Sequence, residues 1–233
     1  MPATIFLESG TDATQDLTFY SSTGGTIASA TDQARTGTRS LRLSSGSPDT
    51  AAFVLRAGVL ADAGRRISVG VMFSAIPPVS ATTFLQILDT SAAGVWSAAL
   101  TTGGLISNRP LGATAVNGTR VIGINTWSRI TVSYTITNTT TFRFDVFVDG
   151  VLDSSATGGT LTRTGSDRLG LRMSVGFGAN QNIWFDDIYI DDGSDYTDPG
   201  NIRVTAKRPN ANGTTNGYTT QIGVGGSGYG TGH

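Results

Sequence analysis

The stretch from Trp127 to Asp192 decides the fold class. It contains three pieces that alternate apolar and polar residues: Trp127-Ser-Arg-Ile-Thr-Val-Ser-Tyr134, Phe142-Arg-Phe-Asp-Val-Phe-Val-Asp-Gly150 and Ile183-Trp-Phe-Asp-Asp-Ile-Tyr-Ile-Asp-Asp192. A period of two is typical of a strand with one buried face and one solvent face, and Asp149-Gly150 supplies a tight reverse turn. These pieces predict an antiparallel, all-β sandwich.

Shorter segments of the same kind precede and separate these pieces, and no stretch has convincing helical periodicity. About a dozen strands at this spacing fit two packed sheets of about six strands each. The predicted strands span residues 4–8, 39–43, 51–56, 66–73, 83–89, 95–101, 120–124, 129–135, 143–148, 160–163, 168–175 and 183–190.

Composition excludes several functional classes. The 233 residues include no cysteine, only 14% charged residues and a formal net charge of −1. Disulfide and thiolate chemistry are therefore excluded, and the dispersed arginines form no basic stripe, so we expect no nucleic-acid partner. No long apolar run and no signal-peptide pattern occurs, so we expect no membrane partner and no signal-directed export.

Side chains that perform catalysis are nearly absent. The chain has one glutamate, one lysine and one histidine, which are Glu8, Lys207 and His233. Sugar hydrolysis needs two carboxylates across the scissile bond, and a serine nucleophile needs a base, which an internal histidine would supply. Pairs of aspartates could replace the usual glutamates, which leaves an enzyme as a third alternative. We predict no catalytic residue and a non-enzymatic protein.

The composition changes after Ile190. Residues 193–233 are rich in glycine, asparagine and threonine and contain few apolar side chains. Such a segment cannot bury enough apolar area to offset an ordering entropy of roughly 1–2 kcal/mol per residue unless a partner covers it. We therefore predict a sandwich domain over residues 1–192 and an extended C-terminal arm or linker over residues 193–233.

The predicted strands resemble the concanavalin A-like lectin/glucanase superfamily, in particular the laminin G-like domains. The resemblance covers about residues 4–192 and implies a two-sheet jelly-roll sandwich, but it does not imply one activity. The motifs that carry it are Trp127-x-x-Ile130-x-Val132-x-Tyr134, Phe144-x-Val-Phe-Val148-Asp149-Gly150 and Trp184-Phe-Asp186-Asp187-Ile188-x-Ile190.

The continuation over residues 195–210 is similar to proteins encoded beside tail and capsid genes of tailed bacteriophages. It reads Asp195-Tyr-Thr-Asp-Pro-Gly-Asn-Ile-Arg-Val-Thr-Ala-Lys-Arg-Pro-Asn210. This resemblance implies a virion structural protein, either a capsid decoration or a tail component, made in the bacterial cytoplasm without a signal peptide. Its expected partners are the major capsid or tail proteins and further copies of itself, as a symmetric trimer. The alternative is a carbohydrate-binding module that attaches to host-surface glycans.

The pair Asp186-Asp187 is the strongest chemical feature of the sequence. On a regular strand the two side chains point to opposite faces, so Asp186 shares a face with Trp184 and Asp187 shares one with Tyr189. An inward-facing carboxylate requires an arginine partner, hydrogen bonds from backbone amides, or a cation. The resemblance implies the cation, a structural Ca²⁺ held by oxygen atoms of Glu8, Asp186 and Asp187. No other cofactor is expected.

Carbohydrate binding would need exposed aromatic rings that stack on sugar faces. The three tryptophans, Trp96, Trp127 and Trp184, each lie in an alternating strand segment with aliphatic residues. We therefore expect all three to fill the core.

Overall fold

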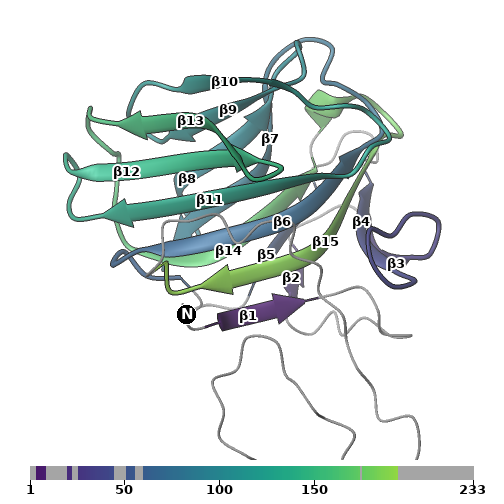
Figure 1. Cartoon of the computed structure of the whole chain (residues 1–233), viewed down its shortest axis with the longest axis horizontal. Coiled ribbons are helices and arrows are strands. Elements are labelled where there is room, and N and C mark those ends of the chain that lie inside the picture. Colours follow the sequence, from purple (N-terminus) through teal and green to yellow (C-terminus); the bar gives the residue numbers. More distant parts are fainter. Residues whose placement is uncertain are drawn as a thin grey trace, which may run out of the picture.

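The computed structural model describes residues 4–8, 20–22, 26–44, 51–55, 60–173 and 175–193 (Figure 1). Two antiparallel sheets account for most of these residues. Sheet A contains β1 (Thr4–Glu8), β3 (Thr26–Ala30), β4 (Ser40–Ser44), β6 (Arg65–Phe73), β11 (Ser128–Ile136), β12 (Phe142–Val148), β13 (Val151–Thr157) and β15 (Asn182–Asp191). Sheet B contains β2 (Tyr20–Ser22), β5 (Ala51–Leu55), β7 (Thr82–Asp89), β8 (Gly94–Leu100), β9 (Leu105–Pro110), β10 (Val116–Val121) and β14 (Ser166–Met173).

The strand order confirms the predicted two-sheet jelly-roll sandwich. Sheet A runs β13-β12-β11-β6-β15-β4-β3, with β1 also paired to β15, and sheet B runs β10-β9-β8-β7-β14-β5-β2. All of these pairings are antiparallel, and most join strands that are distant in the chain. The only helical turn in the described part of the chain is the 3-10 turn η2 (Val175–Phe177). In the same residues no helix is long and apolar enough to cross a membrane.

The core lies between the two sheets and follows the predicted alternation. On β11, Ile130, Val132 and Tyr134 point inward and are nearly fully buried. Aromatic rings from both sheets meet there, since Trp96 of β8 stacks on Phe144 of β12 with ring centroids 5.8 Å apart. Each large apolar side chain that is fully buried contributes roughly 1.5–3 kcal/mol, so this alternation is enough to hold the sheets together.

One polar side chain bridges the sheets inside this core. Asn108 of β9 is fully buried, and its Oδ1 accepts a hydrogen bond from Trp96 Nε1 at 2.7 Å. Its Nδ2 donates to the backbone oxygen of Phe144 on β12 at 2.8 Å. The amide therefore satisfies a donor of sheet B and an acceptor of sheet A, as buried polar groups require.

The sandwich is also linked along one edge, where β13 of sheet A approaches β10 of sheet B. The Oδ1 atom of Asp153 on β13 accepts hydrogen bonds from the backbone nitrogens of Thr119 and Arg120, each at 2.9 Å. Its Oδ2 atom lies against Gly118, where an added Cβ would come within 1.6 Å. This approach requires glycine at position 118.

Several strand predictions need correction. Residues 160–163 form no strand; instead Leu161 and Thr162 donate backbone hydrogen bonds to the loop residues Thr139 and Leu111. The strand predicted at 120–124 is β10, which ends at Val121. Strands β2, β3, β9 and β13 were not predicted. Among these, β9 and β13 are rich in polar residues, and the β13 edge exposes alternate residues, so little apolar periodicity was available to reveal them.

The predicted domain boundary falls one residue after β15, which ends at Asp191. The predicted arm over residues 193–233 lies outside the described residues, apart from Gly193, and stays a prediction.

Candidate functional site

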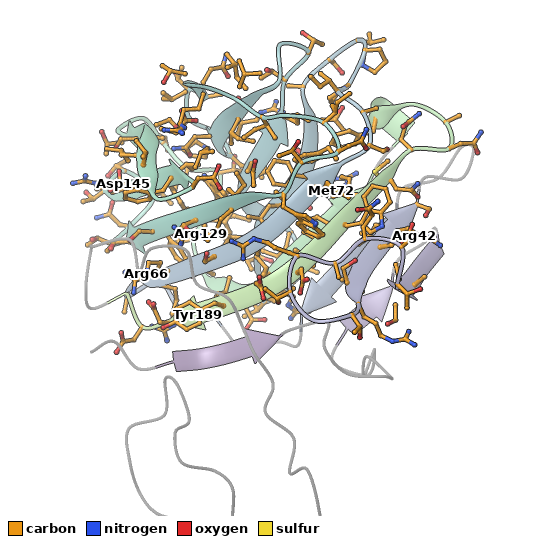
Figure 2. The ribbon with its side chains drawn as sticks, turned by 45° about the vertical axis from the view of Figure 1, so that its right-hand side comes forward. Arg42, Arg66, Met72, Arg129, Asp145 and Tyr189 are labelled. Atoms are coloured by element: carbon orange, nitrogen blue, oxygen red, sulfur yellow. The ribbon has the colours of Figure 1, made fainter. Side chains whose placement is uncertain are left out.

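The outer face of sheet A, which points away from sheet B, carries most of the charged groups that the structure buries. Figure 2 shows Arg66, Met72, Arg129 and Tyr189 on the near side of this sheet. Six charged side chains of the face or its margins are each at most 3% exposed. They are Arg66, Arg129, Asp145, Asp186, Asp187 and Asp191. Charges at this depth must be paired or hydrogen-bonded, so their partners define what the face can do.

Two ion pairs lie on this face, one between the neighbouring strands β6 and β15 and one within β12. Arg66 of β6 is the cross-strand partner of Asp191 on β15, and its Nε and Nη2 both donate to Asp191 Oδ2, at 2.9 and 2.6 Å. On β12, Arg143 Nε donates to Asp145 Oδ2 at 2.6 Å, and Ser155 Oγ donates to the other oxygen. Each of these carboxylates is held as the ion-pair partner of an arginine.

A β-bulge places Asp186 and Asp187 together. Asp186 lies opposite Gly70 of β6 and Tyr189 lies opposite Ser68, so β15 has one more residue than its partner between these pairs. Asp187 takes up the extra residue with a φ of 49°. Both carboxylates therefore reach the loop over residues 31–39, and the prediction that they point to opposite faces is wrong. A bulge shifts the alternation by one residue, which also returns Ile188 to the core.

Arg35 and Thr36 hold both carboxylates. Asp186 Oδ2 accepts from the backbone nitrogens of Arg35 and Thr36 at 2.8 and 3.0 Å, and its Oδ1 accepts from Asp187 N at 2.8 Å. Asp187 Oδ2 pairs with Arg35 Nη1 and its Oδ1 accepts from Thr36 Oγ1, both at 2.5 Å. The Arg35 side chain crosses the sheet over Gly70, where a Cβ would lie 2.7 Å from Arg35 Cδ.

These contacts bear on the predicted calcium site. Glu8 on β1 lies opposite Ile188 in the backbone register, close to the bulge, while its side chain is outside the described residues. All four carboxylate oxygens of Asp186 and Asp187 accept hydrogen bonds, and the Arg35 guanidinium supplies the positive charge that Ca²⁺ would supply. The pair does not fit a calcium ion while Arg35 and Thr36 hold it. No group of three metal-ligating side chains occurs in the part of the chain that is described.

The prediction that all three tryptophans are core residues is confirmed for Trp96, between the sheets, and for Trp184, which is buried in a second apolar cluster on the outer face of sheet A. It is wrong for Trp127. Trp184 packs with Met72 and Ala30 and is 6% exposed, and its Nε1 donates to Asp32 Oδ1 at 3.3 Å. Trp127 packs against the same cluster and stays partly exposed. The sequence carried this signal, because Trp127 is an odd number of residues from Ile130 and regular alternation puts the two on opposite faces.

The phenol of Tyr134 is buried in the core, where it serves the structure of the fold. Burial raises the pKa of the Tyr134 hydroxyl above its usual range. The hydroxyl oxygen lies 3.2 Å from the backbone oxygen of Ala61 and 3.3 Å from Ser166 Oγ, with both partners inside the fold. Tyr134 is therefore protonated near neutral pH and joins the two sheets.

No protein-family model and no curated protein matches the sequence. Solved structures with a similar fold include an endo-β-1,4-glucuronan lyase from Trichoderma reesei, at 12% identity and a TM-score of 0.58, covering 80% of this chain and 94% of that one. A carbohydrate esterase of the Shiga toxin-encoding bacteriophage phi24B has 14% identity and a TM-score of 0.60, covering 82% and 99%. A botulinum neurotoxin type C structure has 14% identity and a TM-score of 0.57, covering 81% and 47%. At these identities the likeness shows a shared all-β sandwich fold.

Proposed function

We propose that the chain is a non-enzymatic structural protein of a tailed-bacteriophage virion, displayed on the capsid or tail in contact with the major capsid or tail proteins. It is made in the bacterial cytoplasm and assembles symmetrically, as a trimer. The observation that supports this proposal concerns the buried carboxylates of sheet A. They form ion pairs with arginines and accept hydrogen bonds from backbone amides and hydroxyl groups. Carboxylates held in this way stiffen a sandwich and are not free to act as an acid or a base on a substrate.

A phage protein among the structural neighbours supports the same proposal. The sandwich of this chain covers 99% of the bacteriophage phi24B esterase chain, so a phage protein can consist almost wholly of this fold. That neighbour carries the name of an enzyme, whereas the described residues here place no serine, histidine and carboxylate together. The fold is shared across many activities, so the difference lies in the side chains that it carries.

The experiment that tests this proposal locates the protein in purified particles. We expect an antibody raised against the full chain to label the capsid or the tail in electron micrographs. We also expect quantitative mass spectrometry to give a copy number that matches the symmetry of that part. A protein found in the lysate of infected cells but absent from washed particles would contradict the proposal. Turnover of an acylated or uronate-containing polysaccharide by the purified chain would contradict its non-enzymatic part.

Carbohydrate binding is a second candidate, and Trp127 favours it. This ring is partly exposed on the outer face of sheet A, directly before β11. An exposed ring can stack on the apolar face of a sugar while neighbouring polar groups bind its hydroxyls. Several structural neighbours act on or bind carbohydrate by name, including the glucuronan lyase and a sialidase. In a virion this activity would attach the particle to host-surface glycans.

A glycan array probed with the full chain tests this candidate. We expect Trp127→Ala to weaken binding by about tenfold or more, because a stacking ring is lost, and Trp127→Phe to keep most of it. Thr139→Ala, an exposed change in the β11–β12 loop, serves as the control. Binding that is equal in the wild type and Trp127→Ala, with both proteins folded by circular dichroism, would remove Trp127 from the proposal.

A further inference from the structure

Four uncharged segments lie at one end of the sandwich: residues 74–81, 101–104, 121–126 and 175–181. None of them contains an aspartate, glutamate, lysine, arginine or histidine, although 14% of the chain is charged. Two exposed charged residues at this end, Arg120 and Asp149, lie outside these segments. We call the surface of the four segments the neutral end. It lies where β6 ends and β15 begins, at the upper right of Figure 1.

Hydrogen bonds join the four segments into one surface. Ser74 Oγ donates to Gln181 Oε1 at 2.8 Å, which links the segment after β6 to the one before β15. Ile122 N donates to Gly104 O at 2.8 Å, and Asn125 N donates to the oxygen of Phe73, the last residue of β6, at the same distance. The neutral end is therefore a continuous part of the described fold.

Aliphatic side chains stand out from this surface. Val79 is 87% exposed, Val121 is 69% exposed and Ile124 is 49% exposed. They are three of the five strongly exposed large apolar residues in the described part of the chain. Ile76 and Val121 both approach within 3.2 Å of the position that a Cβ on Gly104 would take, so apolar atoms of two segments adjoin. Apolar groups gathered on adjoining loops mark a contact surface more often than isolated ones do.

We infer that the neutral end is a self-association surface, which packs against the same end of a second copy of this chain. This inference rests on the proposed function, which includes self-assembly, and it names the surface through which the copies would meet. When a patch meets its own copy, any charge within it faces a like charge, which costs binding energy. The neutral end has no such charge, and the cores of interfaces are depleted of charged residues.

Its chemistry disfavours the other ligand classes. Val79, Val121 and Ile124 are branched aliphatic side chains, which lack the flat ring that stacks on a sugar. A membrane surface is usually bound by a cluster of basic residues and tryptophans beside the apolar ones. The four segments contain neither type, and the residues flanking residues 121–126 add a single arginine, Arg120, and a single tryptophan, Trp127. An uncharged apolar protein surface, such as the same end of a second copy of this chain, fits the neutral end best.

Sedimentation velocity on the full chain, from low to high micromolar concentration, tests the inference. We expect the wild type to associate reversibly, and Val79→Asp and Val121→Asp each to weaken association by about tenfold or more, because they place like charges in the contact. The matched control is Thr139→Asp, since threonine has nearly the shape of valine and Thr139 is exposed in the loop after β11, at the opposite end of that strand. This control should associate like the wild type.

Cysteine cross-linking gives an independent measurement, because the chain has no cysteine of its own. Under mild oxidation we expect Val79→Cys to form a disulfide-linked dimer and Thr139→Cys to remain monomeric. Association of the wild type that neither aspartate variant weakens would overturn the assigned surface and leave self-assembly standing. A wild type that stays monomeric at every concentration would overturn both. Binding of the neutral end to another purified virion protein, without self-association, would also overturn the inference, because that protein and not a second copy would then cover the surface.

Discussion

At the residue scale, Asp89 shows how one side chain closes a turn. It is the last residue of β7, and its Oδ1 accepts from Ser91 Oγ at 2.6 Å, Ser91 N at 2.8 Å and Ala93 N at 2.9 Å. The Ser91 hydroxyl, followed by the Ala93 amide, lowers the pKa of this carboxyl from 3.8 to about 2. These donors stabilise the ionised form and fix the turn of the β7–β8 hairpin.

This lowered pKa predicts a pH dependence of stability. A carboxyl whose pKa is lower in the folded than in the unfolded chain stabilises the fold above its unfolded value, and the benefit is lost as the pH falls toward the folded value. We expect the wild type to be more stable than Asp89→Asn at neutral pH, with the difference shrinking between pH 3.8 and about 2. Urea unfolding of both proteins across this range measures it. A difference that stays constant with pH would show that the Asp89 charge has no part in the turn.

At the scale of the element, the bulge in β15 converts two neighbouring acids into one binding unit for the loop over residues 31–39. Asp187 adopts a left-handed backbone conformation, with a φ of 49°, which aspartate tolerates better than most residues. Asp186 then accepts hydrogen bonds from the backbone amides of Arg35 and Thr36, and Asp187 forms an ion pair with the Arg35 guanidinium. This unit attaches the loop to β15, an interior strand of sheet A.

Removing the guanidinium should therefore be costly. Arg35→Met leaves the Asp187 carboxylate buried without its ion-pair partner, and we expect a loss of about 3–5 kcal/mol in unfolding free energy. The control is Arg42→Met, because Arg42 and Asp32 form an exposed pair at 3.2 Å, and such pairs contribute about 1 kcal/mol or less. Chemical denaturation measures both. Equal losses in the two variants would mean that burial does not distinguish the pairs.

The same unit gives a test of the calcium prediction. If Arg35 stands in the place of a cation, Ca²⁺ should raise the melting temperature of Arg35→Ala, whose carboxylates lack the guanidinium, and should leave the wild type unchanged. Differential scanning calorimetry with calcium and with a chelator makes the comparison. Stabilisation of the wild type by Ca²⁺, lost in Glu8→Gln, would instead support the site predicted from Glu8, Asp186 and Asp187.

At the scale of the whole molecule, polar links join the sheets in addition to the apolar core, and two of them give testable predictions. Asn108 connects Trp96 of sheet B to the Phe144 carbonyl of sheet A in the interior. We expect Asn108→Leu to lower the unfolding free energy by about 2–4 kcal/mol, because a buried donor and a buried acceptor both lose their partner. The exposed Asn117 of β10 provides the control, since Asn117→Leu should change stability by about 0.5 kcal/mol or less. An unfolding free energy that Asn108→Leu leaves unchanged would contradict this role and show that the core relaxes around an apolar side chain.

The second link closes the edge between β10 and β13. Gly118→Ala would place a Cβ 1.6 Å from Asp153 Oδ2, so we expect a loss of about 1–3 kcal/mol from overpacking. In Gly103→Ala, the nearest atom would lie 3.9 Å away, and stability should hardly change. Thermal unfolding compares these variants. Because the clash involves one side chain, Asp153→Ala should reduce the effect of Gly118→Ala, and strict additivity of the two changes would contradict this geometry.

The alternation of apolar and polar residues was enough to predict the sandwich and the central strands β6, β11, β12 and β15. It predicted the buried faces as well, since burial of every second side chain is what selects that pattern. It could not reveal β9 and β13, whose polar residues hydrogen-bond to neighbouring strands without an apolar period. Strand pairing depends on backbone groups that every residue carries, and these leave little trace in the sequence.

The amino-acid sequence alone establishes the all-β class, the scarcity of catalytic side chains and the lack of charge in the segments that form the neutral end. The folded structure was needed to show that Asp186 and Asp187 point the same way and that Arg35 is their partner. The physical reason is that a bulge is defined by the partner strand, so one extra residue on β15 becomes visible only against the register of β6. Likewise, uncharged segments far apart in the chain become one surface only when the strands bring their ends together.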